Sequence, residues 1–147
     1  MSYTQVYYHI VFSTRGRLQI LHKDRRNDLF GYLWGILKNK RSHLYQLGGA
    51  EDHVHMLTSI HSTVCLADLV RDLKASSTSW IRRERFFERF PGWQSEYAAL
   101  TKSHSHRDGV VAYIRNQEVH HRRESFVDEL KRLFGEEGID FDERYLL

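Results

Sequence analysis

The chain has 147 residues, of which 41% are hydrophobic and 28% charged, and a formal net charge of +3. This length predicts one domain, residues 1–147, with its own hydrophobic core. No apolar stretch approaches the roughly 20 residues that cross a bilayer, and the start of the chain lacks the pattern of a secretory signal. The single cysteine, Cys65, excludes an internal disulfide. We therefore expect a protein of the reducing cytoplasm, with Cys65 as a small core residue.

The first half of the chain predicts three strands and a helix. Residues 3–13 are rich in aromatic and β-branched types, which favour a strand. Apolar residues then recur at three- and four-residue spacing over 24–40, which is typical of an amphipathic helix. Two further predicted strands, 43–50 and 53–60, are joined by a short connection that begins with two glycines. We expect these two strands to form an antiparallel hairpin.

The second half predicts a helix over 66–87, a strand over 94–102, a helix over 107–121 and a final helical segment over 123–134. The order is therefore β-α-β-β-α-β followed by a C-terminal helix. This order predicts an α+β fold of the ferredoxin-like class. Its antiparallel sheet would carry two helices on one face, and a C-terminal helix would be added.

Two histidines, His53 and His55, lie two residues apart on a predicted strand. Side chains alternate along a strand, so both imidazoles point to the same face and can reach one metal ion. The spacing alone is weak, because a second pair, His104 and His106, occurs in the same chain. The alternative is a pair of half-exposed polar residues on the outer face of a sheet.

Tyr113 and Gln117 lie four residues apart in a predicted helix and therefore share one helical face. Val110 and Ile114 lie on a different, apolar side of the same helix. A tyrosine that faces away from the core beside an amide is a candidate for chemistry. The alternative is an amphipathic surface tyrosine beside a solvated glutamine.

These motifs and several others together resemble the single-tyrosine HUH transposases of small bacterial insertion sequences, including relatives associated with repetitive extragenic palindromes. The segments that carry the resemblance are residues 7–14, 51–57, 73–77, 113–117 with His120 and His121, 125–126 and 142–146. They occur in the expected order on the expected elements. The chain departs from the family at Glu96-Tyr97, where relatives have glycine before the tyrosine, and this affects the local geometry of the fourth strand.

The resemblance implies a role for each matching residue. Tyr113 would be the nucleophile that forms a covalent 5′-phosphotyrosine intermediate, and His53, His55 and Gln117 would bind a divalent metal. Because this set leaves positions open for phosphate oxygens and water, Mg²⁺ or Mn²⁺ is expected, whereas an amide is a poor ligand for zinc.

The resemblance also implies the partners. The substrate would be single-stranded DNA with a hairpin, which the enzyme cleaves and rejoins in the bacterial cytoplasm, associated with the nucleoid. The family usually works as a homodimer, whose active sites can be shared between subunits.

Basic residues provide candidates for DNA contact, in keeping with a pI of 9.1. Four candidates lie at a turn or near a helix end, namely Arg15, Arg17, Arg82 and Arg83, and a fifth, Lys74, lies on the second predicted helix, which would flank the site. Solvated basic residues are also common at helix ends, so each has an alternative reading without DNA.

Three other functions compete with a transposase. A domesticated relative would nick single-stranded DNA at palindromic repeats with the same residues. A non-catalytic module would stack bases on Tyr3, Tyr7 and Tyr8 of the first strand. A phosphoesterase with paired His-x-Thr motifs fits poorly, because only His61-Ser62-Thr63 matches.

Overall fold

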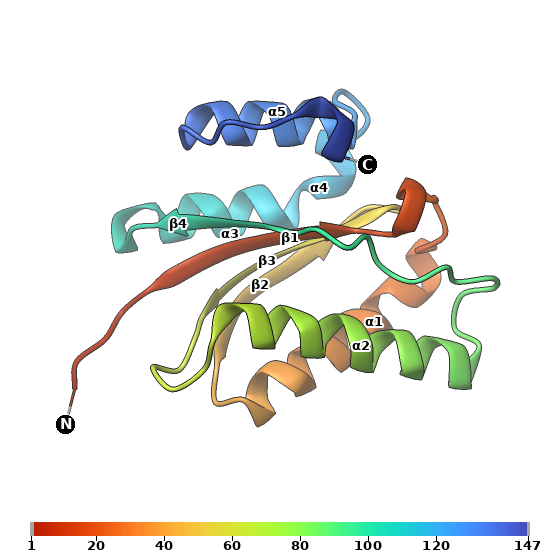
Figure 1. The fold of residues 1–147 in the computed structure, drawn as a ribbon, viewed down its shortest axis with the longest axis horizontal. Coiled ribbons are helices and arrows are strands. Elements are labelled where there is room, and N and C mark those ends of the chain that lie inside the picture. The colour runs from red at the N-terminus through yellow and green to blue at the C-terminus, as the bar shows by residue number, and fades with distance from the viewer. Residues whose placement is uncertain (1, 147) are drawn as a thin grey trace.

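A four-stranded antiparallel sheet separates two helical layers in the computed structural model, which describes residues 2–146 (Figure 1). The strands are β1 (Tyr7–Ser13), β2 (His43–Gly49), β3 (His53–Ser59) and β4 (Ala98–Lys102), in the order β2-β3-β1-β4. One layer contains α1 (Lys23–Asn39) and α2 (Leu66–Glu84). The other contains α3 (Arg107–Arg115), α4 (Gln117–His120) and α5 (Phe126–Glu136). The β-α-β-β-α-β prediction is confirmed, including the hairpin of β2 and β3.

Several predicted boundaries differ from the structure, among them those of the helices predicted over 66–87 and 123–134, which span 66–84 and 126–136. β1 begins at Tyr7, and the helix predicted over 107–121 is divided at Asn116 into α3 and α4. β4 begins at Ala98 because the residues before it are bound elsewhere. The Lys74 ammonium group donates hydrogen bonds to the carbonyl oxygens of Gln94, Ser95 and Glu96, at 2.7, 3.3 and 2.9 Å.

The main core lies between the sheet and the layer of α1 and α2. Alternation along β1 and β3 sends one set of apolar side chains into it, namely Ile10, Phe12, Val54 and Met56. Leucines from both helices at three- and four-residue spacing complete it, namely Leu29, Leu33, Leu37, Leu69 and Leu73. The intervening residues of the same two strands therefore face the opposite layer.

The second face of the sheet is covered by the C-terminal third of the chain. Ile114 of α3 packs beside Tyr7 and Leu57, and Phe126 and Leu130 of α5 pack beside Val11. Figure 1 shows α5 above α3 and α4, far from α1 and α2. This cover buries His53 and His55 to 0% exposure, so the alternative of a half-exposed histidine pair is wrong.

Gly48 of β2 sets the close approach of α3 to the sheet. A Cβ atom at Gly48 would lie 2.1 Å from the carbonyl oxygen of Ile114. Gly48 pairs with His55 across the sheet, so the same contact brings α3 over the histidine strand. Glycine is required here by the approaching backbone.

The structure bears on two other expectations, one for Cys65 and one for membrane-spanning helices. Cys65 is exposed, not a core residue, because it stands at the N-cap of α2 where the chain enters the helix. Among residues 2–146, no helix combines the length and apolarity that crossing a bilayer requires.

Replacing Gly48 with alanine is expected to lower the free energy of unfolding by about 1–3 kcal/mol, because α3 must move off the sheet. Gly35→Ala is the matched control. Gly35 lies inside α1 with nothing within 4 Å of its added Cβ atom, so this change is expected to stabilise by about 0.5–1 kcal/mol. Urea denaturation measures both. Equal stability of Gly48→Ala and the wild type would contradict the close contact.

Candidate active site

The residues predicted for catalysis meet on the second face of the sheet. β3 supplies His53 and His55, α3 supplies Tyr113 and α4 supplies Gln117. The rings of His55 and Tyr113 have centroids 6.0 Å apart. Gln117 places its side-chain oxygen 3.1 Å from Nε2 of His53. One chain therefore brings all four predicted residues together.

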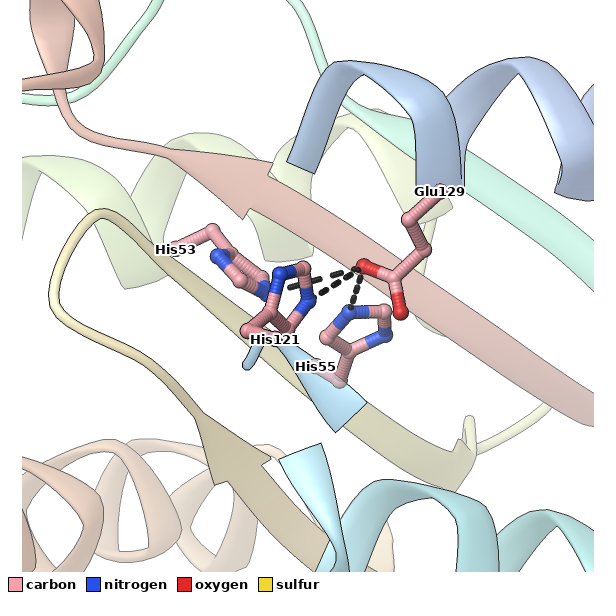
Figure 2. A group of neighbouring side chains, drawn as sticks. All are labelled: His53, His55, His121 and Glu129. Carbon is pink, nitrogen blue, oxygen red and sulfur yellow. Dashed lines mark hydrogen bonds and ion pairs between the residues drawn. The ribbon is translucent and has the colours of Figure 1, made fainter. Parts of the chain in front are cut away.

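A carboxylate outside the predicted set, Glu129 of α5, reaches into this group, and Figure 2 shows it beside the imidazoles of His53, His55 and His121. Its Oε1 atom is 3.0 Å from Nε2 of His55, 3.0 Å from Nε2 of His121 and 3.6 Å from Nε2 of His53. The side chain is fully buried. Three imidazoles therefore converge on one carboxylate oxygen.

The other oxygen of Glu129 binds the candidate nucleophile. The Tyr113 hydroxyl donates a hydrogen bond to Oε2, and the Gln117 amide donates another to the same atom at 3.1 Å. Arg132, one turn further along α5, donates a hydrogen bond to the Tyr113 hydroxyl at 2.8 Å. Tyr113 is thus held between an anion and a cation from one helix.

Local sequence explains why Glu129 points inward. Ser125 caps α5, its hydroxyl accepting a hydrogen bond from the Asp128 amide at 3.2 Å. The helix then buries one stripe: Phe126, Glu129, Leu130 and Leu133. An acidic residue within an otherwise apolar stripe was the signal that could have identified Glu129. His121 carried no comparable signal beyond its place in the resemblance.

Both strand histidines have a partner behind them. Nδ1 of His53 donates to the Asp52 carboxylate at 2.6 Å, and Nδ1 of His55 lies 2.8 Å from Nε2 of His9. The other nitrogen of His9 is buried without a hydrogen-bond partner among the described residues. Metal-binding histidines commonly use such partners to fix the ring and direct the free nitrogen to the ion. Here the free nitrogens face Glu129.

Burial and hydrogen bonding set the charges. Burial lowers the pKa of His55 to about 4, against the opposing hydrogen bond to Glu129. Burial would raise the pKa of the Glu129 carboxyl, but hydrogen bonds from His121, His55 and Tyr113 outweigh it and hold that pKa well below its usual range. Burial and the bond to Glu129 raise the pKa of Tyr113, while Arg132 opposes them. The phenol is therefore protonated beside a charged carboxylate.

The donor set suits a metal ion. The ligand atoms of His53, His55, His121 and Glu129 all lie within 4.8 Å of one another. Imidazole nitrogens and a carboxylate oxygen this close together can bind one divalent cation. The hydrogen-bond partners of His53 and His55 hold these two rings in place for it. A second group, of His120, Glu124 and Glu129, shares the same carboxylate.

The five basic candidates do not form one surface. Arg15, Lys74 and Arg82 line one pocket of about 550 Å³ between α2 and the residues that precede β4. Arg17 lines a separate pocket of about 630 Å³ that also includes His121. Arg83 is exposed and forms an ion pair with Glu84.

Known proteins share both the sequence and the fold of this chain. The family model "Transposase IS200 like" matches residues 2–117. The ISDra2 transposase TnpA of Deinococcus radiodurans is 26% identical over 118 residues, which cover 77% of this chain and 84% of the relative.

Two solved structures are similar. One is the crystal structure of a candidate transposase from Deinococcus radiodurans, with a TM-score of 0.59 and 27% identity over 80% of this chain and 95% of that chain. The other is a REP-associated tyrosine transposase bound to a REP hairpin. Its TM-score is 0.63 over 82% of this chain and 74% of that chain, and its 14% identity shows the fold alone. Because the family model spans most of the sequence, the chain belongs to the IS200-like transposase family.

Proposed function

We propose that this transposase cleaves and rejoins single-stranded DNA with Tyr113 as its nucleophile, in a metal-dependent reaction. The observation that carries the proposal is the single buried cluster in which the Tyr113 hydroxyl shares the Glu129 carboxylate with His53 and His55. Cleavage of a phosphodiester through a covalent intermediate needs a nucleophile next to a bound divalent cation. A tyrosine beside a cation site meets this need.

The reaction proceeds in two balanced steps. The Tyr113 oxygen attacks the scissile phosphorus, a bond from phosphorus to the phenol oxygen forms, and the bond to the 3′ oxygen breaks. The phenol proton is lost to solvent while Glu129 and Arg132, which both hydrogen-bond the hydroxyl, orient its oxygen, and the departing 3′ oxygen takes up a proton from solvent. A second strand's 3′ hydroxyl then attacks the 5′-phosphotyrosine and loses its proton to solvent. The bond from phosphorus to the phenol oxygen breaks, and that oxygen takes up a proton from solvent and restores the phenol. The covalent bond conserves the energy for rejoining, so no ATP is needed.

His53, His55 and the Gln117 amide oxygen are proposed to hold the metal, Mg²⁺ or Mn²⁺. When bound, the ion withdraws charge from the scissile phosphate and orients it for in-line attack. Asp52 and His9 orient the two imidazoles, and Arg132 provides a positive charge at the attacking oxygen. Positioning within a buried site supplies much of such a rate enhancement.

The proposed substrate is single-stranded DNA that contains a hairpin, in the bacterial cytoplasm at the nucleoid. The REP-associated tyrosine transposase, which has a similar fold, was solved bound to a REP hairpin, and this supports the proposal. We propose that the pocket lined by Arg15, Lys74 and Arg82 binds phosphates, with Lys74 also supporting the segment before β4. Arg17 lies where it would contact the strand near the cut, and Arg83 would add to the positive charge beyond α2.

The competing non-catalytic reading is less well supported. Stacking bases on Tyr3, Tyr7 and Tyr8 requires accessible rings. Tyr7 is buried against Tyr45 and Ile114 and Tyr8 packs on the main core, so only Tyr3, which precedes β1, is fully exposed. The non-catalytic reading also assigns no role to the cluster of side chains around Glu129. A nickase at palindromic repeats would use the same residues and remains a variant of the proposal.

Tyr113→Phe is expected to reduce the covalent protein–DNA adduct to background, because the attacking oxygen is removed, while hairpin binding stays within about twofold of the wild type. Labelled hairpin DNA with Mn²⁺, followed by denaturing electrophoresis, measures the adduct. Tyr32→Phe on α1, in the opposite layer, is the control and should form the wild-type amount. An adduct in Tyr113→Phe would refute the assignment of the nucleophile.

The site is proposed to work within one chain, although the resemblance implies a homodimer with shared sites. Mixing Tyr113→Phe with His53→Ala separates the two arrangements. Sites shared between subunits would regain activity in mixed dimers, because one composite site would hold an intact tyrosine and an intact histidine pair. Sites within one chain would stay inactive after mixing. We expect no recovery of cleavage in the mixture. Recovered cleavage would show that the subunits of a dimer exchange α3, which bears Tyr113.

Removing Arg15 and Arg82 together is expected to weaken hairpin binding and to flatten its dependence on salt. For single strands the slope of log affinity against log salt becomes shallower by about 0.7 for each phosphate that the protein no longer neutralises. Fluorescence anisotropy at several salt concentrations gives the slope. Lys38→Ala removes a positive charge from α1, where the ammonium group lies over the Trp34 ring, and should leave the slope unchanged. Equal slopes in all three proteins would exclude this pocket.

A further inference from the structure

Two side chains in the cluster come from beyond the segment that the family model matches. The match ends at residue 117, whereas His121 follows α4 and Glu129 lies on α5. Both nevertheless contact the histidine pair of β3 directly, as Figure 2 shows. The C-terminal segment of this chain therefore adds donor atoms to the site.

Glu129 is a buried charge without a lysine or arginine partner among the described residues. The basic groups near its carboxylate are the imidazoles of His53, His55, His120 and His121, which carry a charge only when protonated. Moving a carboxylate out of water costs several kcal/mol unless an opposite charge compensates. A divalent cation among the same ligands would supply that charge.

The two oxygens of Glu129 divide the site. Oε1 faces Nε2 of His55 and His121, whereas Oε2 accepts hydrogen bonds from Tyr113 and Gln117. A cation on the Oε1 side would leave the bonds to Oε2 in place. One carboxylate could then bind the ion and hold the nucleophile at once.

We infer that His121 and Glu129 are metal ligands of this chain, which join His53, His55 and the Gln117 amide oxygen in one site. The donor atoms of the three imidazoles and of Glu129 already lie within 4.8 Å of one another, so small side-chain movements bring them onto one ion. This inference rests on the proposed function for the identity of the site, and it adds two ligands from the C-terminal segment.

The ligand types determine which ion is preferred. Imidazole nitrogen suits first-row transition metals, whereas Mg²⁺ prefers oxygen ligands and retains its water. Three nitrogens and one carboxylate oxygen therefore favour a transition ion such as Mn²⁺ over Mg²⁺. With His121 and Glu129 as ligands, this preference is stronger than for two imidazoles and an amide.

The neighbouring group of His120, Glu124 and Glu129 is a poor cation site. The Arg132 guanidinium lies 3.2 Å from Nε2 of His120 and 3.1 Å from the Glu124 carboxylate. It already neutralises Glu124 and repels a cation. His120 and Glu124 thus offer control positions next to the proposed ligands.

Metal binding by the full-length protein without DNA tests the inference. After treatment with a chelator, the protein is titrated with Mn²⁺, and free Mn²⁺ is followed by electron paramagnetic resonance. We expect one ion per wild-type chain and at least about tenfold weaker binding of Mg²⁺ in competition. Glu129→Gln and His121→Asn should each weaken Mn²⁺ binding about tenfold or more, whereas Glu124→Gln and His120→Asn should bind like the wild type.

The Mn²⁺ affinities of the variants decide whether His121 and Glu129 are ligands. Unchanged or tighter binding in Glu129→Gln would overturn the inference, because the carboxylate would then only occupy the place of the ion. Circular dichroism checks folding, and His121→Asn decides the question if Glu129→Gln does not fold. His53→Ala separates this inference from the proposed function. If that variant alone loses Mn²⁺, the proposed metal site stands without the two added ligands, and if no variant loses Mn²⁺ both fail.

Discussion

The second half of this protein is organised around one buried negative charge. Glu129 reaches from α5 to the sheet and is surrounded by imidazoles, an amide and a phenol. Because a lone carboxylate is costly away from water, each of these groups must be oriented toward it. The positions of α3, α4 and α5 over the sheet therefore have an electrostatic as well as a hydrophobic cause.

Contacts of α3 with β2 and of α4 with α1 are a second constraint on the site. Gly48 lets α3 approach β2 at the residue that pairs with His55, and this places Tyr113 over the histidine strand. Arg26 of α1 donates to Glu118 at 2.5 Å and ties α4, with its Gln117, to the start of α1. Contacts at some distance from the cluster thus fix the relative position of the candidate nucleophile and the proposed ligands.

Much of the fold could be predicted from local patterns, because β1, α1 and the β2–β3 hairpin have clear periodicity and few competing structures. The break at Asn116 could not, since the helical pattern of the sequence runs through this residue, whose backbone leaves the helical conformation at φ −95° and ψ 20°. The candidate catalytic residues follow from the resemblance, since the spacing of His53 and His55 alone is ambiguous. Glu129 interrupts an apolar stripe of α5, but its partners lie 8 to 76 positions away in the sequence, and that stripe does not show which groups it meets.

β3 serves the apolar core and the chemistry at the same time, with Val54 and Met56 on one face and His53 and His55 on the other. Inserting or deleting one residue in this strand would exchange the two faces, driving imidazoles into the core and aliphatic groups into the cluster. Length changes in β3 therefore disrupt the core and the histidine cluster together. Within this strand, only substitutions can remove the imidazoles and leave the apolar face in place.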